Sequence, residues 1–443
     1  MSNYLNICED IIKLSKSKGI TECDVILQSG ESLDISVLEG DVDKYESASS
    51  HVVGIRTIYN NRVGMAYSES FEKKSIDTMI DMAKANSEAG EENKHEKISF
   101  SNASFEDHDQ VQKDTSTLDE KIEKAITLER TVFEKDKNVK NNPHNGLSFS
   151  KGEYLYMNSH QVSGSARRQY FSCYTSAFYE KASQSSLAMG SSLAYTLGGL
   201  DIDYCVTKSI RNGSEWLRAK TLETGSYDVI FDTDILSQLF YTFSNIYSGK
   251  ELMKNVNPFK DKLGEIVIGG DLTITDDPQY KENFFLSYFD DEGCKQKPLV
   301  LVENGKLQSF IHNSVTADFS NTTSTGHGVR GAKSPLSVGL NNLIISGGKL
   351  NDLEVQKGKY FEIHKLQGLG SGANSITGEF SAAASGYFCE DGEVLFPVKG
   401  VTISGNFHKM MRDIEFCGQK IHSSNSRRFF APLVKFLQMK IAS

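Results

Sequence analysis

Three adjacent carboxylates form the densest acidic group of the sequence, in the segment Phe289-Asp290-Asp291-Glu292-Gly293. Carboxylates this close together can bind a cation, serve as an acid and a base in one reaction, or stabilise a turn. In an extended backbone the side chains alternate, so Asp290 and Glu292 would point to one side and Asp291 to the other. All three converge only if the backbone bends. We favour a turn that is either solvated or held by backbone N–H groups bound to its carboxylates.

The histidines are too far apart for a metal site on a single helix. Such a zinc site needs two imidazoles on one helical face, about three to five positions apart, usually with a glutamate as base. The ten histidines are His51, His95, His108, His144, His160, His312, His327, His364, His408 and His422. The closest pair, His95 and His108, is separated by thirteen positions. The sequence therefore predicts no catalytic residue and no metal ligand in this chain, with a site assembled from distant residues as the remaining alternative.

Two glycine-rich segments resemble nucleotide-binding loops, but each departs from the pattern. Residues 368–373 read GLGSGA and follow a predicted strand, but Gly378 and another strand pattern come where a dinucleotide site needs a helix. Residues 326–334 read GHGVRGAKS, in which Ala332 separates glycine from lysine and makes a phosphate-binding loop one residue too long. No serine lies in G-x-S-x-G, and Cys389 fits an ordinary strand position. The first segment is interpreted as a flexible loop.

The elements that position these groups begin with an α+β unit at residues 1–90. Apolar residues recur at helical spacing over 4–18 and 75–85, and they alternate as in strands over 25–27, 33–37, 52–58 and 62–67. Ser29-Gly30 is predicted to be a turn between the first two strands. Tyr59-Asn60-Asn61 predicts a tight hairpin between the last two. A charged linker is expected over 91–117.

The remainder divides into a central α+β domain over 118–222 and a C-terminal β-rich domain over 223–443. Helical spacing at 118–137 and 203–220 encloses strands near 147–149, 154–157 and 169–179. After a helix at 235–247, strand patterns alternate with glycine-rich turns. The fold class is α+β, with mixed or antiparallel sheets and flanking helices in the N-terminal part and a mostly antiparallel, curved or barrel-like C-terminal β domain.

Composition and charge exclude several classes of protein. The 443 residues carry 48 basic and 58 acidic side chains, a formal net charge of −10, so no basic surface for nucleic acid is expected. The apolar runs are shorter than the roughly 18–20 residues that span a membrane. The seven cysteines form no C-x-x-C pair, which is typical of unpaired thiols in a reducing compartment. We expect a cytoplasmic protein that binds neither nucleic acid nor membrane.

An ordered set of motifs in the C-terminal half resembles the TldD/PmbA family. The set is FDDEG at 289–293, LVENGKL at 301–307, STG at 324–326, GLGSG at 368–372, TGEFS at 377–381, ASGY at 384–387, EDGEV at 390–394, PV at 397–398 and VTISGN at 401–406. The resemblance implies a cytoplasmic zinc-dependent peptidase built from two related subunits. The TldD-like subunit carries H-E-x-x-x-H and a downstream cysteine as metal ligands, and the PmbA (TldE) type lacks them. Here the helix 235–247 has neither histidine nor glutamate, and Ala384 is placed where the cysteine would stand.

These departures identify the PmbA-like type, which completes the chamber in which a TldD-like partner, carrying the zinc, cuts unfolded peptides. No cofactor is expected in this chain, and a homodimer is a second possibility for its assembly. Residues expected to face the substrate cavity or the subunit interface are Asp290, Asp291, Glu292, Gly370, Gly372, Thr377 and Glu379, the alternative being that both segments are folding turns. Two other functions remain: a regulatory or scaffold protein of the gyrase-modulator type, and a stand-alone hydrolase with a site built from distant residues.

Overall fold

The computed structural model describes residues 2–100, 108–181 and 184–443. One sheet joins strands from both N-terminal units, in the order β3-β2-β1-β5-β6-β4, with β7 paired to β6. Its strands are β1 (Glu22–Leu38), β2 (Asp41–Tyr59), β3 (Arg62–Ser68), β4 (His108–Gln110), β5 (Gly146–Asn158), β6 (Ser163–Lys181) and β7 (Gln184–Ala194). The pairing of β1 with β5 makes the two units one continuous surface.

Strand β1 shows where local sequence signals succeed and fail. The predicted turn at Ser29-Gly30 is wrong, because β1 runs straight through it and Gly30 pairs with Ser50 on one side and Gly152 on the other. The hairpin at Asn60 and Asn61 is confirmed. Both residues adopt positive φ (49° and 58°), as a tight turn between antiparallel strands requires.

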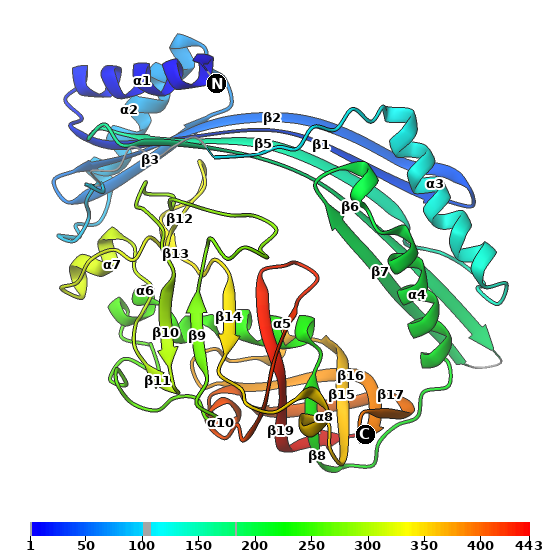
Figure 1. Cartoon of the computed structure of the whole chain (residues 1–443). Helices are drawn as coiled ribbons and strands as arrows, with labels where there is room; N and C mark the ends of the chain where they lie inside the picture. Colours follow the sequence, from blue (N-terminus) through cyan, green and yellow to red (C-terminus); the bar gives the residue numbers. More distant parts are fainter. Residues whose placement is uncertain (1, 101–107, 182–183) are drawn as a thin grey trace.

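All four long helices pack against one face of this sheet, which we call the outer face (Figure 1). They are α1 (Ser2–Ser17), α2 (Lys73–Ala89), α3 (Leu118–Lys135) and α4 (Ile202–Trp216). Odd-numbered residues of β1 face these helices, with Leu27 in the cluster of α1 and α2 and Leu33 in the cluster of α3 and α4. Even-numbered Ile26 packs instead with Phe289 and Ala332 of the C-terminal half. The opposite, inner face of the sheet therefore lies against the C-terminal half.

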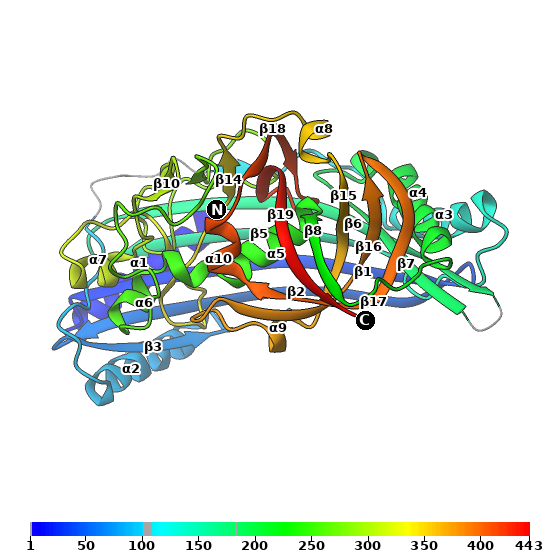
Figure 2. The same cartoon turned by 90° about the horizontal axis from the view of Figure 1, so that it is seen from below.

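The C-terminal half is built on a ten-stranded sheet whose strands β19, β17, β16, β15 and β8 pair in a closed ring. The strands of this sheet are β8 (Gly225–Phe231), β9 (Thr273–Asp276), β10 (Leu299–Glu303), β11 (Lys306–Leu307), β14 (Leu343–Ser346), β15 (Lys359–Gln367), β16 (Glu379–Glu390), β17 (Glu393–Asn406), β18 (Phe416–Ser423) and β19 (Phe429–Ala442). A separate pair joins β12 (Gly328–Val329) and β13 (Ser337–Val338). Figure 2, seen from below, shows the ring strands in front of β1, β2 and β5.

Short helices connect the strands of this half of the chain. They are α5 (Thr233–Thr242), α6 (Gly249–Met253), α7 (Ser314–Phe319), α8 (Asp352–Val355), α9 (Leu369–Gly372) and α10 (Phe407–Arg412), with a 3₁₀ turn at Ser244–Tyr247, whereas the 3₁₀ turn Leu197–Gly199 precedes α4 in the N-terminal part. Leu239 and Phe240 of α5 are buried with the inward side chains of the ring strands. The predicted α+β class, with a barrel-like C-terminal sheet, is confirmed. Among the residues that the structure describes, no helix is both long and apolar enough to cross a bilayer.

Candidate functional site

The acidic segment forms a tight turn that contacts the inner face of the sheet. Asp290 N donates to Cys294 O at 2.9 Å, and Gly293 N donates to Asp290 O at 2.9 Å. Gly293 has a φ of 69°, and a Cβ atom there would lie 2.5 Å from the ring of Tyr156 on β5. Only glycine meets both demands, so this residue allows the turn to approach the sheet.

The carboxylates of the turn divide as the alternation predicts. Asp290 accepts hydrogen bonds from Glu292 N at 3.0 Å, Cys294 N at 2.8 Å and Gly328 N at 2.7 Å. Glu292 accepts from both the backbone N–H (2.7 Å) and the hydroxyl of Ser314. Asp291 points elsewhere and accepts from Arg330 N at 2.8 Å. Asp290 and Glu292 are therefore N–H-binding carboxylates, one of the alternatives drawn from the sequence.

A buried network of charges joins this turn to the sheet. Arg56 on β2 donates to Asp24 on β1 through Nε (2.9 Å) and Nη2 (2.7 Å), and its Nη2 lies 3.5 Å from Glu292 Oε1. On the other side of Asp24, Arg330 Nη1 lies 2.9 Å from Asp24 Oδ1. These four side chains are at most 1% exposed. Two arginines and two carboxylates thus compensate one another across the boundary between the two halves.

Burial also changes the protonation of the acidic turn. Desolvation and the neighbouring Glu292 raise the pKa of Asp290 well above its ordinary value. Desolvation likewise raises the pKa of Glu292, although Arg56 opposes this effect. The pKa of Asp291 is raised by burial, against the attraction of Arg330 and Arg168. Two carboxyls held close together in a dry site favour sharing a proton over bearing two full charges.

A cavity of about 290 Å³ lies between the turn and the inner face of the sheet. It is lined by Gln28, Ser29, His108, Ser150, Gly152, Glu153, Tyr154, Ala166, Arg168, Tyr170, Leu286, Ser287, Tyr288, Phe289 and Asp291. Burial and the adjacent Arg168 lower the pKa of His108, and burial with the adjacent Asp291 raises the pKa of Tyr154. A neutral imidazole, a protonated phenol, a guanidinium and a carboxyl group therefore share one cavity, where they can hold the polar groups of a ligand.

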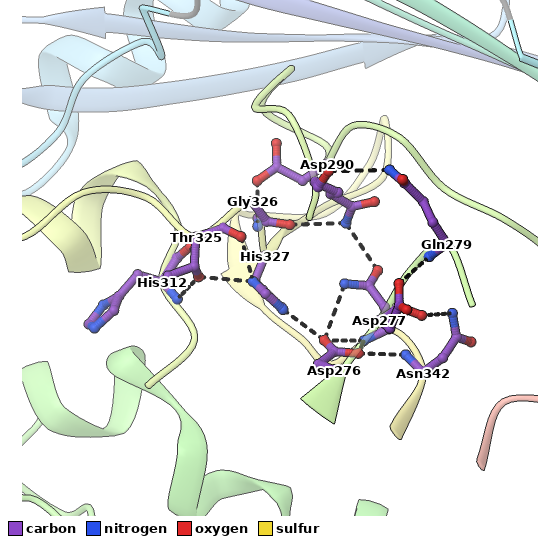
Figure 3. Close-up of polar contacts among 12 residues, drawn as sticks. Asp276, Asp277, Gln279, Asp290, His312, Thr325, Gly326, His327 and Asn342 are labelled. Atoms are coloured by element: carbon purple, nitrogen blue, oxygen red, sulfur yellow. Dashed lines mark hydrogen bonds and ion pairs between the residues drawn. The ribbon is translucent and has the colours of Figure 1, made fainter. Parts of the chain in front are cut away.

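A second polar network fixes the loop that supports the turn (Figure 3). Buried His327 lies between Asp276, whose Oδ2 is 2.7 Å from Nε2, and Thr325, whose Oγ1 is 2.9 Å from Nδ1. Asp276 also accepts from the backbone N–H of Asn342 at 2.6 Å. The residue after His327, Gly328, donates to Asp290. The pairing of His327 with Asp276 could not be predicted from the sequence. The spacing of histidines tests only for metal sites, and it does not indicate a partner 51 residues away.

The glycine-rich loop lies elsewhere, against the end of β17. Asn406 Nδ2 donates to Thr377 O at 2.8 Å and to Glu379 Oε1 at 2.9 Å. A Cβ atom on Gly372 would lie 2.1 Å from Ser381 O, whereas one on Gly370 would meet nothing within 4 Å. Glu379 lines two further cavities, of about 600 and 340 Å³. Of the residues singled out from the sequence, only Asp291 lines the cavity beneath the sheet, and the structure does not bring the two groups into one site.

The residues present fit a catalytic zinc ion poorly. Within the described ranges, Asp290, Glu292 and Cys294 are the one group of three potential ligand residues whose atoms lie within 4.8 Å of one another. Five N–H or O–H donors already bind the two carboxylates, and Arg56 lies 3.5 Å from Glu292, so a cation there would compete with these donors and with a buried guanidinium. Burial and the nearby carboxylates raise the pKa of the Cys294 thiol to about 12, so the cost of deprotonating it would oppose metal binding.

Comparisons with known proteins cover nearly the whole chain. Three family models match: PmbA/TldA metallopeptidase domain 1 over residues 23–87, the central domain over 113–212 and the C-terminal domain over 224–443. The metalloprotease PmbA of Escherichia coli O157:H7 is 25% identical over 434 residues, which is 95% of this chain and 92% of that protein.

Solved structures share the fold. TldE from Thermococcus kodakarensis superposes with a TM-score of 0.85 at 22% identity, covering 99% of this chain and all of that one. A Thermotoga maritima protein described as a candidate modulator of a DNA gyrase superposes with a TM-score of 0.87 at 24% identity, with the same coverage.

Proposed function

The chain belongs to the TldD/PmbA metallopeptidase family, and we propose that it is the PmbA (TldE)-like subunit of a two-component zinc peptidase. In this proposal a TldD-like partner holds the zinc and cuts unfolded peptides, while this chain completes the chamber and holds substrate. The relatives support the pairing, because they include proteins named PmbA and one from Buchnera aphidicola named a TldD homologue. Its place in the cell is predicted to be the cytoplasm.

One observation carries the proposal: the chain has a ligand-sized cavity lined by polar groups but a poor donor set for zinc. Helix α5, where the sequence places the missing H-E-x-x-x-H, contains neither histidine nor glutamate, and Leu239 and Phe240 on it are buried in the ring. Ala384, placed where the ligand cysteine would stand, is also buried there. The apolar side chains on α5 and at Ala384 supply packing rather than metal ligands.

The cavity offers this chain a part in the reaction that needs no metal. Asp291 presents an acceptor, and Tyr154 and Arg168 present donors, to a chain lying along the inner face of the sheet. An unfolded peptide carries one donor and one acceptor for almost every residue, so such groups can hold its backbone. Aromatic side chains such as Tyr170 and Phe289 give the same cavity apolar walls.

The test is to mix the chain with a TldD-like partner and measure cleavage of an unfolded peptide. Asp291→Asn keeps an oxygen for Arg330 N but removes the carboxylate, and we expect kcat/KM to fall about tenfold, the loss of one hydrogen bond to a charged group. Asp10→Asn, at an exposed position on α1, is the matched control. Unchanged assembly and turnover in D291N would disprove the assignment of the cavity. Stoichiometric zinc and peptide hydrolysis in the chain alone would disprove the subunit role and favour the stand-alone hydrolase.

A scaffold that modulates DNA gyrase is the second candidate, supported by the description given to the Thermotoga maritima structure. The net charge of −10 argues against direct contact with DNA, so binding to the gyrase protein itself would carry this function. A pull-down with purified gyrase separates the two functions, because a peptidase subunit has no need to bind it.

A further inference from the structure

The N-terminal sheet has a long exposed edge on β2. Strand β3 covers β2 only from Val53 to Tyr59, and no strand in the described part of the chain pairs with the outer edge of residues 41–52. Residues 41–51 are all exposed, on both faces of the strand. Strand β7, at the far edge of the same sheet, instead alternates buried and exposed residues because α4 packs on it. Proteins cover such an edge or place charged side chains along it, and the charges on this edge decide which strand can pair with it.

The side chains along this edge can pair with those of a second, antiparallel copy of β2 when the two strands are centred on Tyr45. Tyr45 is 47% exposed and stands between Lys44 and Glu46. When two antiparallel copies of β2 meet with Tyr45 opposite Tyr45, each Lys44 lies opposite the Glu46 of the other copy. Two opposite-charge pairs then flank an aromatic pair, and both kinds of cross-strand pair stabilise a sheet. Within one chain Lys44 Nζ already lies 2.9 Å from Glu46 Oε1, so these charges lie on the same face and can exchange partners.

Neighbouring registers lack this match. Centring the pair on Lys44 would place Lys44 opposite Lys44, and centring it on Glu46 would place Glu46 opposite Glu46. Like charges directly opposite one another destabilise a sheet. The charges therefore select the register centred on Tyr45, with a two-fold axis perpendicular to the sheet.

We propose that a second copy of this chain docks on β2, edge to edge and antiparallel about Tyr45, so that the two N-terminal sheets become one. This proposal concerns the chain alone and does not rest on the peptidase role. Residues 47–50, Ser-Ala-Ser-Ser, supply small uncharged side chains that let the rest of the edge approach closely. The acidic Asp41 and Asp43 fall opposite Ser49 and Ser47 and meet no like charge.

Charge reversal tests the register as well as the surface. Lys44→Glu places glutamates opposite each other, and Glu46→Lys does the same with lysines, so each variant should dimerise about tenfold or more weakly than the native chain. A mixture of the two variants restores both opposite-charge pairs, as does the double variant K44E/E46K. Mass photometry or sedimentation velocity on the full chain measures this, with circular dichroism to show that each variant is folded. Asp10→Lys, an exposed reversal on α1, should leave dimerisation unchanged.

A native chain that is monomeric at tens of micromolar would overturn the proposal. So would a dimer that survives both single reversals, because it would use another surface. Folded single variants that fail to associate when mixed would overturn the register.

Discussion

Replacing Arg56 by methionine should destabilise the protein more than any surface change, because it leaves buried Glu292 without its counter-ion and Asp24 with Arg330 alone. Arg56 lies 2.7 Å from Asp24 and 3.5 Å from Glu292, and all three are at most 1% exposed. At an effective dielectric constant of about 20, two unit charges 3.5 Å apart attract by about 5 kcal/mol. The mutation also removes the cost of burying the guanidinium, so the net loss in the free energy of unfolding should be about 3–5 kcal/mol.

The loss should depend on pH in a direction that the structure fixes. Arg56 opposes the rise in the pKa of Glu292, so R56M should raise that pKa further. A group whose pKa is raised on folding contributes stability at low pH and loses it as the pH rises through the folded value. The deficit of R56M against the native chain should therefore be smaller at pH 5 than at pH 8.

Urea unfolding at both pH values, followed by circular dichroism, measures the deficit. Arg130→Met is the matched control, since Arg130 makes only exposed ion pairs on α3 and should cost less than about 0.5 kcal/mol. A deficit of R56M below about 1 kcal/mol at pH 8 would refute the reasoning. A deficit that grows as the pH falls would refute the assigned role of Glu292.

Two further changes test other parts of the molecule. Gly372→Ala should lower the free energy of unfolding by about 1–3 kcal/mol, because its Cβ would lie 2.1 Å from Ser381 O, while Gly370→Ala should change it little; thermal unfolding of the two variants compares them directly. Burial lowers the pKa of His312 to about 4, so between pH 6.5 and 4 this residue binds a proton in the unfolded chain but not in the folded one, and its own contribution to stability should fall by about 3 kcal/mol as the pH drops through that range. His312→Gln should flatten this part of the pH–stability curve, and an unchanged slope would mean that another group titrates.

Local features of the fold could be predicted from the sequence because their causes are local. Asn60 and Asn61 tolerate positive φ, so the hairpin is encoded in the two residues that form it. The turn expected at Ser29-Gly30 failed because a glycine also suits a strand whose neighbours on both sides supply hydrogen bonds, and those neighbours come from distant parts of the chain.

The candidate site divides in the same way. The separation of Asp291 from Asp290 and Glu292 agrees with the alternation drawn from the sequence, although the backbone turns at these residues and does not run extended. The ion pair between Glu292 and Arg56 joins residues 236 positions apart, and nothing in the local sequence of either residue marks it. Sequence patterns thus show which side chains turn inward, whereas their partners follow only from the tertiary fold.

The closed ring of the C-terminal half has a consequence for how the protein folds. Strand β8 completes the ring by pairing with β19, and the pair Ile230–Lys435 joins residues about 200 positions apart. Bringing β8 and β19 together reduces the conformational entropy of the chain between them before their contacts have formed. Folding that depends on such distant contacts is slow. Until β19 is synthesised and pairs with β8, one edge of β8 stays unpaired in the newly made chain. Intermediates with unpaired strand edges are prone to aggregation, and chaperones commonly bind them. Synthesis in the cell should therefore leave this half of the protein the last to mature.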